Sequence, residues 1–244
     1  MSQNIQKGEL LYEGKAKKIF AIPGNETEVL VLFKDSLTAF NALKKGEFEN
    51  KGAINREITS LLFQYLSRKR IQTHWVSDLS ATEMVVKKVE IIPLEVVIRN
   101  VLAGSTAKKL GIEEGRVLSK PLVEFYFKND ALADPFLSDD QALMMEIVTA
   151  AEIETLKKKA LELNSVLKDL WNKAQITLVD FKVEFGRTKS GEILLADEIS
   201  PDCCRLWDQK TGEKLDKDRF RRDLGSVKEN YELVLSRLRG ALNG

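Results

Sequence analysis

The segment that most constrains the fold covers residues 176–208, ITLVDFKVEFGRTKSGEILLADEISPDCCRLWD. Its first part alternates apolar and charged residues, which is typical of a β-strand with one buried face. A turn at residues 188–191 and a second apolar strand at 193–199 follow, so the segment predicts a β-hairpin. A loop of two or four residues would place Lys182 opposite Asp197.

Three acids, Asp180, Glu184 and Asp197, are expected to share one face of this hairpin with Lys182. Carboxylates crowded together in a dry site disfavour each other's charge. A Mg²⁺ ion with phosphate oxygens would relieve this, because Mg²⁺ is commonly held by a few carboxylates together with phosphates. The alternative is a solvated face of an edge hairpin with ordinary salt bridges. The acid-rich loop that follows favours a functional site, since such sites concentrate in loops.

Composition narrows the class of protein. The 244 residues suffice for one large domain or for two smaller ones that share a cleft. Lys and Arg number 38 and Asp and Glu 37, which gives no support to a surface for nucleic acid or anionic membrane. No apolar run is long enough to span a membrane, and the N-terminus has no apolar signal core.

Cysteine and histidine usage excludes several kinds of site. The adjacent Cys203 and Cys204 have no partner motif, so we expect reduced thiols in a cytosolic protein. His74 is the single histidine, which argues against Ser-His or Cys-His catalysis and against a histidine-rich zinc site. We expect His74 at the surface or in a turn.

The order of elements predicts a β-rich N-terminal part followed by mixed strands and long helices. Strands are expected at residues 9–12, 19–22, 29–33, 83–89 and 94–101, and helices at 54–66, from Thr149 to about 174, and at 220–242. Thr149 and Glu152 match a capping box. Pro93 would form either a stiff hinge between two lobes or a plain strand connection.

Two further stretches are candidate phosphate sites. The turn GKAKK at residues 14–18 is either a solvated basic turn or a site whose N–H groups and lysines hold a polyphosphate. Farther on, Arg99 precedes Gly104 and Ser105, and these open a short helix that Gly111 ends. Ser105 suits the N-cap. A capped helix start near an arginine can bind phosphate, and an ordinary capped helix is the alternative.

A series of segments in this order resembles the SAICAR synthetase family. These segments are LYEGKAKKIF, KGAINRE, IPLEVVIRNVLAGS, EFYFKNDALADP, LVDFKVEFG, LADEISPDCCRLWD and DKDRF. The resemblance runs from about residue 10 to about residue 231. It implies an α+β fold with a small, kinase-like antiparallel β lobe at residues 1–90 and a larger, ATP-grasp-related lobe at 91–244. The ATP cleft would lie between the two lobes.

The resemblance also implies a reaction. ATP would phosphorylate the carboxylate of carboxyaminoimidazole ribonucleotide, and the amine of L-aspartate would attack the acyl phosphate, giving the succinocarboxamide, ADP and phosphate. Phosphorylation supplies the leaving group that a carboxylate lacks, so the protein mainly neutralises charge and aligns anions. The implied cofactor is Mg²⁺ with ATP as co-substrate. The implied protein is a cytoplasmic homodimer of purine biosynthesis with no nucleic-acid or membrane partner.

The resemblance assigns roles to residues that match the family's motifs. The residues implied to bind ATP are Lys15, Ala16, Lys17, Lys87, Ile91 and Lys128. The implied ligands of Mg²⁺ are Glu184 and Asp197. The residues implied to bind the ribonucleotide are Arg99, Gly104, Ser105, Asp134 and Arg205. The catalytic residues would be Lys182, near the reacting carboxylate and γ-phosphate, and Asp180.

One segment departs from the family pattern. Residues 38–42 read TAFNA where many relatives read like TAGDG, so no acid role is carried over to Asn41. Asn41 could still touch the reacting groups, with Asp35 as a weaker candidate.

Three other functions are considered. A kinase would need H-R-D and D-F-G motifs, and Asp180-Phe181-Lys182 is not D-F-G. A catalytically silent nucleotide-binding module would not need both the metal acids and the Arg99, Ser105 and Arg205 set. An ATP-grasp-like ligase with a different acid and amine stays open, because one sequence does not reveal the pocket for the amine.

Overall fold

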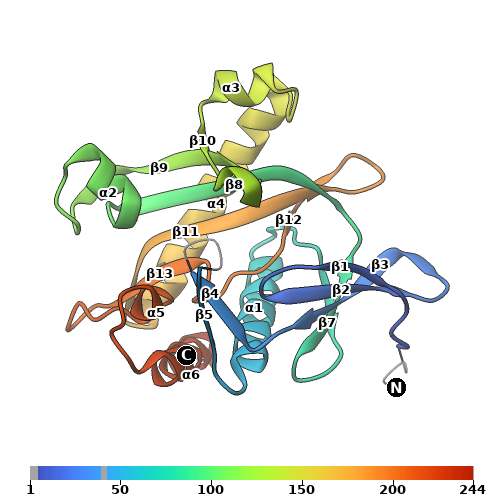
Figure 1. Ribbon diagram of the computed structural model, residues 1–244, viewed down its shortest axis with the longest axis horizontal. Helices are drawn as coiled ribbons and strands as arrows, with labels where there is room; N and C mark the ends of the chain where they lie inside the picture. Colours follow the sequence, from blue (N-terminus) through green and yellow to red (C-terminus); the bar gives the residue numbers. More distant parts are fainter. Residues whose placement is uncertain (1–4, 40–42, 244) are drawn as a thin grey trace.

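Two antiparallel sheets form the body of the protein, as the computed structural model of residues 5–39 and 43–243 shows (Figure 1). The smaller sheet has the order β1 (Leu10–Glu13), β2 (Lys17–Ile22), β3 (Asn25–Phe33), β7 (Glu83–Lys87) and β6 (Trp75–Asp78). The larger sheet has the order β10 (Phe136–Leu137), β9 (Val117–Phe127), β8 (Glu90–Val101), β11 (Ile176–Arg187) and β12 (Ile193–Ala196), and β13 (Cys204–Asp208) also pairs with β11. The expected α+β class is therefore confirmed.

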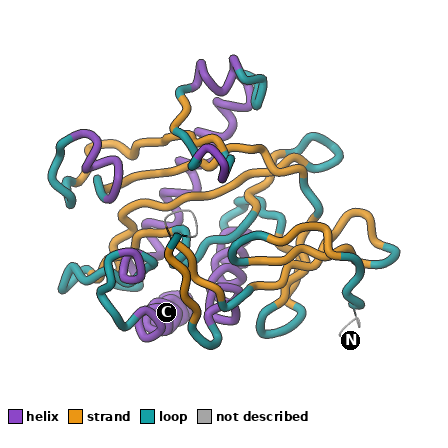
Figure 2. The backbone as a smooth tube through the Cα atoms, in the orientation of Figure 1, coloured by secondary structure: helices purple, strands orange, loops and turns teal. Residues whose placement is uncertain are grey.

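The remaining elements cover and connect these sheets. The helices are α1 (Lys51–Arg68), α2 (Gly104–Leu110), α3 (Asp139–Met144), α4 (Ala150–Lys173), α5 (Asp218–Arg221) and α6 (Val227–Asn243), with a 3₁₀ turn at Asp130–Leu132. A separate hairpin joins β4 (Ser36–Ala39) to β5 (Lys44–Glu47). In Figure 2, α4 crosses behind the strands of the larger sheet, and α1 and α6 lie side by side below it.

Strand β11 is central in the larger sheet. It pairs with β8 on one side and with β12 and β13 on the other. The alternative of a solvated edge hairpin is therefore wrong, and the acids Asp180 and Glu184 are buried. The hairpin itself forms, but Lys182 lies opposite Val97 of β8 and not opposite Asp197. Asp197 follows the last residue of β12, beyond the paired part of the hairpin.

Pro93 lies inside β8 and does not form a hinge. β8 runs without interruption from Glu90 to Val101, and its pairing with β11 shifts register between Glu184 and Gly186, next to Pro93. A strand tolerates proline at such an irregularity, because the missing N–H is not required there. The chain instead passes from the smaller to the larger sheet between β7 and β8.

Two separate groups of buried apolar residues stabilise the fold. The smaller group lies on the smaller sheet and consists of Val29, Val31, Phe33, Met84 and Val86. The larger group combines the inner faces of α1, α4 and α6 with the larger sheet. α4 contributes a continuous apolar seam to this group, since Leu156, Ala160, Leu163, Leu167 and Leu170 are all buried.

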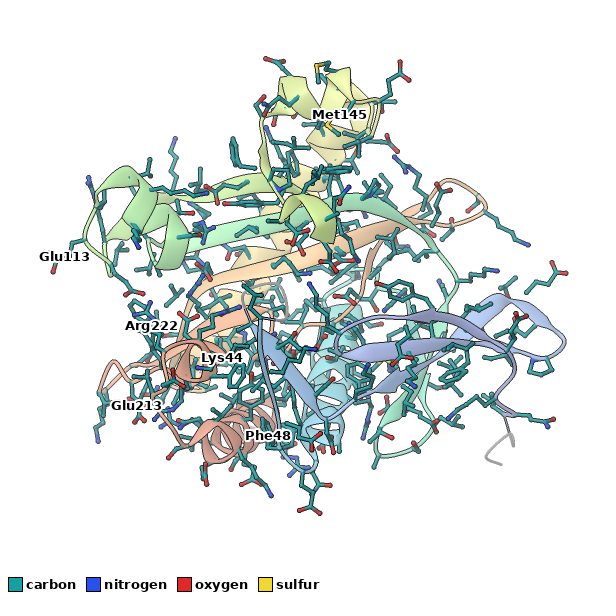
Figure 3. All side chains as sticks on the ribbon, in the orientation of Figure 1. Lys44, Phe48, Glu113, Met145, Glu213 and Arg222 are labelled. Carbon is teal, nitrogen blue, oxygen red and sulfur yellow. The ribbon has the colours of Figure 1, made fainter. Side chains whose placement is uncertain are left out.

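The β4–β5 hairpin connects the N-terminal part of the chain to its C-terminal helices. The Nζ of Lys44 lies 2.6 Å from the carbonyl oxygen of Phe220 and 2.5 Å from Asp223. Phe48, just after β5, packs edge-on against Tyr231 of α6. Figure 3 shows Lys44 beside α5 and Phe48 beside α6. This contact brings the start of α1 close to the loops that follow β12.

Two expectations from composition can be compared with the fold. Among the described helices, none combines the length and apolar character needed to cross a bilayer. Cys203 and Cys204 are both free thiols, and Cys204 is buried.

The expected capping box of α4 is present: Thr149 accepts a hydrogen bond from the Glu152 N–H, and the Glu152 carboxylate accepts one from the Thr149 N–H.

The capping box gives a first testable prediction. Glu152 also accepts a hydrogen bond of 2.6 Å from Arg187, and this bond lowers the pKa of Glu152 from 4.5 to about 2. We expect Glu152→Ala to lower the free energy of unfolding by about 1 kcal/mol. Glu152→Gln should cost less, because its amide oxygen still accepts the Thr149 N–H. Urea unfolding at pH 7 measures both variants.

The charge on Glu152 makes this effect depend on pH. The folded-state pKa lies below the ordinary value, so the stabilisation is present above pH 4.5 and is lost as pH falls toward 2. The stability difference between the wild type and Glu152→Gln should therefore shrink in acid. A difference that stays constant from pH 7 to pH 3 would contradict the ion pair with Arg187.

Candidate functional site

One face of the larger sheet is polar, opposite the face that packs on α4. On β11 this face carries Asp180, Lys182 and Glu184, which alternate with the buried apolar residues of the core. The register with β8 places Arg99 beside Asp180 and Glu95 beside Glu184. The strand period of two therefore gathers charged side chains from neighbouring strands on a single surface. They form two clusters.

The first cluster contains lysines and carboxylates and is called here the lysine–carboxylate cluster. Its members are Lys17, Glu95, Lys128, Lys182, Glu184, Asp197 and Glu198. The Nζ of Lys182 lies 2.8 Å from Glu184 and 3.0 Å from Glu95. Lys128 pairs with Glu184, and Lys17 pairs with Asp197 and, at 2.9 Å, with Glu198. Lys17 thus reaches from the smaller sheet to the end of β12.

Electrostatics favour the charged forms of Lys17, Lys182 and Asp197 in this cluster. Burial opposes the charge of Lys17, but Asp197 and Glu198 outweigh it and raise the pKa of Lys17. For Asp197, burial opposes ionisation, but Lys17, Lys182 and Lys128 outweigh it and lower the pKa. Burial likewise opposes the charge of Lys182, and Glu184 and Glu95 raise its pKa well above the ordinary value. Lys182 is therefore an ammonium ion at neutral pH and does not act as a base.

Glu184 and Asp197 are the carboxylates of this cluster that could hold a metal together with phosphate oxygens. Among residues 5–39 and 43–243, no group of three or more His, Cys, Asp and Glu side chains could bind a metal unaided. Mg²⁺ does not need such a cage, since one or two carboxylates with phosphates are its usual protein ligands in nucleotide sites. The donor set fits an ion that arrives with a nucleotide.

His74 is buried next to this cluster in the bend before β6, so the expected surface position is wrong. Only 6% of His74 is exposed, and its Nε2 lies 3.2 Å from the carbonyl oxygen of Asp197. Burial lowers the pKa of His74 from 6.5 to about 4, so the ring is neutral at pH 7. Asp197 has φ 61°, a left-handed conformation that is uncommon for a residue other than glycine.

The second cluster contains arginines and aspartates and is called here the arginine–aspartate cluster. Its members are Arg99, Asp180, Arg205 and Asp218. Asp180 accepts hydrogen bonds from Arg99 at 2.7 Å and from Arg205 at 2.9 Å. The Nε of Arg205 also donates to Asp218 at 2.9 Å. The carboxylates hold both guanidinium groups in fixed positions, which suits binding of an oxyanion.

Gly104 lies against Arg205 at the start of α2. Gly104 has φ +61°, and a Cβ atom at this position would lie 2.5 Å from Nη2 of Arg205. The glycine therefore leaves the space that the guanidinium group fills. Ser105 is not the N-cap as expected: α2 begins at Gly104, its N-cap is Ala103, and Ser105 is exposed in the first turn. Gly111 ends the helix as expected, with φ 64°.

The GKAKK turn faces the loop after β9. Lys15 forms an ion pair of 2.7 Å with Asp130, and the carbonyl oxygen of Ala16 accepts a hydrogen bond from the Lys34 N–H. Asp134 accepts a hydrogen bond from the Asn129 N–H at 2.9 Å and so stabilises its own loop. The smaller and larger sheets therefore touch where the turn carrying Lys15 meets this loop.

Several expected site residues form no hydrogen bond or ion pair with either cluster within the described part of the chain, among them Lys87, Ile91 and Asp134. Lys87 is exposed, although its N–H donates to the His74 carbonyl oxygen at 2.6 Å. Ile91 lies near the start of β8, where it pairs with Gly186. Asp134 forms its hydrogen bond within its own loop. Asn41 lies outside the described residues. Asp35 accepts hydrogen bonds from the N–H groups of Asn50 and Gly52 at the start of α1.

Several residues of the clusters were not found from the sequence. Glu95 and Glu198 join the first cluster, and Asp218 joins the second. The alternation of Glu95, Val97 and Arg99 on one strand face was the signal for Glu95, and the DKDRF segment contains Asp218. No local pattern marked His74, because its neighbours come from distant parts of the chain.

Comparison with known proteins gives consistent matches over almost the whole chain. The sequence profile described as SAICAR synthetase matches residues 10–238. A phosphoribosylaminoimidazole-succinocarboxamide synthase of Lysinibacillus sphaericus is 53% identical over 236 residues, which is 97% of this chain and 100% of the relative.

Solved structures agree with the sequence matches. The crystal structure of a phosphoribosylaminoimidazole-succinocarboxamide synthase from Ehrlichia chaffeensis has a TM-score of 0.92 and 46% identity, and covers 95% of this chain and 98% of that chain. A SAICAR synthetase (Type-2) in complex with ADP has a TM-score of 0.91 and 44% identity, with the same coverage of both chains.

Proposed function

Because the chain belongs to the SAICAR synthetase family, we propose that the two clusters of its polar face bind two different anionic groups of the substrates. One cluster would bind the phosphates of ATP, and the other the phosphate of the ribonucleotide. The chain is an ATP-dependent ligase of purine biosynthesis that joins carboxyaminoimidazole ribonucleotide to L-aspartate. The observation that supports these two separate roles is that both charged clusters include side chains from the polar face of β11. A substrate between them would have its phosphate in one and its reacting carboxylate near the other.

The lysine–carboxylate cluster is the proposed site of the ATP phosphates. Lys15, Ala16, Lys17 and Lys128 would hold the phosphates below the GKAKK turn, and Lys87 with Ile91 would line the adenine pocket. The ion pair of Lys17 with Asp197 and Glu198 supports this, because it keeps a charged lysine at the end of β12. A structure with ADP from a relative of 44% identity supports a nucleotide site in this fold.

Glu184 and Asp197 are the proposed ligands of Mg²⁺. Bound there with the nucleotide, Mg²⁺ would neutralise charge on the triphosphate. Each carboxylate is paired with a lysine here, so the lysines would turn to phosphate oxygens while the carboxylates hold the cation. After this exchange each lysine would be paired with phosphate, and both carboxylates would be paired with Mg²⁺.

Lys182 is proposed to stabilise charge at the reacting centre. The substrate carboxylate attacks the γ-phosphorus of ATP, and the bond from that phosphorus to the oxygen of ADP breaks. The amine of L-aspartate then attacks the acyl carbon, the bond from that carbon to the phosphate oxygen breaks, and inorganic phosphate and the proton from nitrogen leave. Glu184 and Glu95 keep Lys182 protonated and fix its position, so its ammonium group can stabilise negative charge as it develops in both steps.

The arginine–aspartate cluster is the proposed site of the ribonucleotide phosphate. Arg99, Ser105 and Arg205 would bind its oxygens, Gly104 would leave room for Arg205, and Asp134 would complete the pocket. Asp180 supports the site by orienting both arginines before the substrate arrives. Preorganised donors of this kind bind an anion with little rearrangement.

The division into two lobes, the cytoplasmic location and the dimeric state of the enzyme are also proposals. We place a small, kinase-like lobe at residues 1–90 and a larger, ATP-grasp-related lobe at 91–244, with ATP between them. The separate buried group of the smaller sheet supports this division. We propose a cytoplasmic homodimer, in keeping with two free thiols and with the family resemblance. Light scattering coupled to size-exclusion chromatography tests the dimer.

An omission assay tests the proposed reaction. Purified protein is incubated with ATP, Mg²⁺, carboxyaminoimidazole ribonucleotide and L-aspartate, and ADP release is measured with each component left out in turn. We expect release to require all four. Release that persists without L-aspartate would indicate a kinase or an uncoupled ATPase. Release that requires another amine in place of L-aspartate would indicate a ligase with a different acid and amine.

Gly104 provides a prediction for the phosphate site. In Gly104→Ala the new methyl group would displace the Arg205 guanidinium, so we expect the KM for the ribonucleotide to rise roughly ten- to a hundredfold, with ADP affinity unchanged. Gly111→Ala is the matched control: it has a similar positive φ on the same helix, but its Cβ would meet nothing within 4 Å. Equal KM values for the two variants in steady-state kinetics would contradict the role of Arg205.

A further inference from the structure

We propose that His74 is a positioning residue that holds Asp197 in its left-handed conformation and thereby aims the Asp197 carboxylate at the nucleotide-bound metal. The inference rests on the proposed role of Asp197 as a Mg²⁺ ligand. It concerns the backbone of Asp197, which the proposed metal role alone does not address.

The contact between the two residues has a defined direction. Nε2 of His74 lies 3.2 Å from the carbonyl oxygen of Asp197. A carbonyl oxygen only accepts hydrogen bonds, so Nε2 carries the proton and donates. Asp197 has φ 61°, and this left-handed conformation is unfavourable for a residue other than glycine, so neighbouring contacts must maintain it. The His74 donor is such a contact.

His74 is itself held in place from three directions. Its N–H donates to the carbonyl oxygen of Leu195 at 2.8 Å, and its own carbonyl oxygen accepts from the Lys87 N–H at 2.6 Å. Its ring packs edge-on against Phe63 of α1, with 5.7 Å between ring centroids. His74 therefore connects the smaller sheet, α1 and the end of β12, and its ring nitrogen has little freedom to move.

The two hydrogen bonds from His74 span the point where β12 ends. The backbone N–H binds Leu195, and the ring binds Asp197, two residues later. Together they fix the turn that directs the Asp197 side chain toward Lys17. Without the ring donor, the Asp197 backbone can relax to a more favourable φ, and its carboxylate would leave its position beside Lys17. The part of nucleotide affinity that depends on the metal should then weaken.

Calorimetric titration of ADP, with and without MgCl₂, tests this inference on His74→Gln and His74→Leu. The amide nitrogen of glutamine is separated from Cα by the same number of bonds as Nε2 of histidine, so glutamine can restore the donor. Leucine fills space but donates nothing. We expect His74→Leu to lose roughly ten- to a hundredfold of ADP affinity in Mg²⁺ and little without it, as for other residues that orient metal ligands. His74→Gln should stay within about threefold of wild type.

Three outcomes would overturn the inference. His74→Leu could keep the full Mg²⁺ enhancement, or His74→Gln and His74→Leu could lose it equally, which would assign the effect to ring packing. A wild type with tight ADP binding but no Mg²⁺ enhancement would remove the metal role of Asp197 itself. Wild-type protein that binds no ADP at all would instead contradict the proposed function.

A second variant covers the case in which His74→Leu does not fold. The amide of His74→Asn is polar but too short to reach the Asp197 carbonyl oxygen, so it should behave as leucine does in the ADP titration. Thermal unfolding of all variants separates stability from positioning, because a purely structural role would rank the variants by melting temperature and not by the presence of the donor.

Discussion

Replacing Asp197 with asparagine is expected to lower ATP-dependent ligation by about 10²- to 10³-fold, because a metal-assisted charge stabilisation of several kcal/mol is lost. Asp197 supplies a negative charge among Lys17, Lys128 and Lys182, and these lysines lower its pKa despite its burial. Asparagine keeps the shape but not the charge. Lys17 would then pair only with Glu198, and the metal would lose one of its two proposed carboxylates.

The measurement is the rate of ADP release with all four components present, over a range of MgCl₂ concentrations. We expect the Asp197→Asn variant to need more Mg²⁺ for half-maximal rate as well as to be slower. Glu192→Gln is the matched control, because this acid is exposed in the turn between β11 and β12 and should not affect the rate. A normal rate and a normal Mg²⁺ requirement in Asp197→Asn would contradict the metal role.

The second large effect concerns stability and the buried pair of Lys51 and Asp202. Lys51 is 1% exposed at the start of α1, and its Nζ lies 2.5 Å from Asp202. Tyr231 of α6 donates a hydrogen bond of 2.7 Å to the other carboxylate oxygen. Burial opposes the charge of Asp202, but Lys51 outweighs it and lowers the pKa. This pair connects α1, α6 and the loop between Asp197 and β13.

We expect Lys51→Met to lower the free energy of unfolding by about 3 kcal/mol, because it leaves a buried carboxylate without its partner. For a chain of this length that corresponds to a fall in melting temperature of roughly 10 °C. The effect lies at the lower end of the range for buried pairs, since Lys217 also acts on Asp202 electrostatically. Thermal and urea unfolding measure it, with Lys168→Met on the exposed face of α4 as control.

A double variant tests whether the unpaired charge causes the loss. In Lys51→Met with Asp202→Asn, no buried charge remains at this pair, and the asparagine oxygen still accepts the Tyr231 hydroxyl. We expect the double variant to be more stable than Lys51→Met alone, with a coupling of about 1 to 3 kcal/mol. Additive losses would show that the two side chains do not stabilise each other.

Much of this protein follows from local pattern. The alternation in β11 separates its core side from its polar side, and Asp180, Lys182 and Glu184 share that polar side in the structure. The capping box of Thr149 and Glu152 starts α4, and the seam of that helix is buried. These features depend on side chains within one or two turns or along one strand, so their spacing in the sequence is sufficient to find them.

Motif spacing also indicated the family and most members of the two clusters. Arg99 and Arg205 lie together, and Lys17 pairs with Asp197. Asp180, which was expected beside Lys182 and Asp197, pairs with the two arginines instead. The function follows from these motifs because a ligase that aligns several anions needs cations and acids of this kind on one surface.

Only the tertiary structure decided where these patterns lie. β11 is central and not an edge, because β8 and β13 pair with it from elsewhere in the chain: Arg99 and Asp180 are separated by 81 positions. His74 is buried for the same reason, since its contacts come from α1, β7 and the end of β12. The left-handed φ of Asp197 and the N-cap at Ala103 also depend on surrounding contacts. Local spacing sets which face a side chain occupies, whereas burial and backbone strain depend on segments that meet only when the chain has folded.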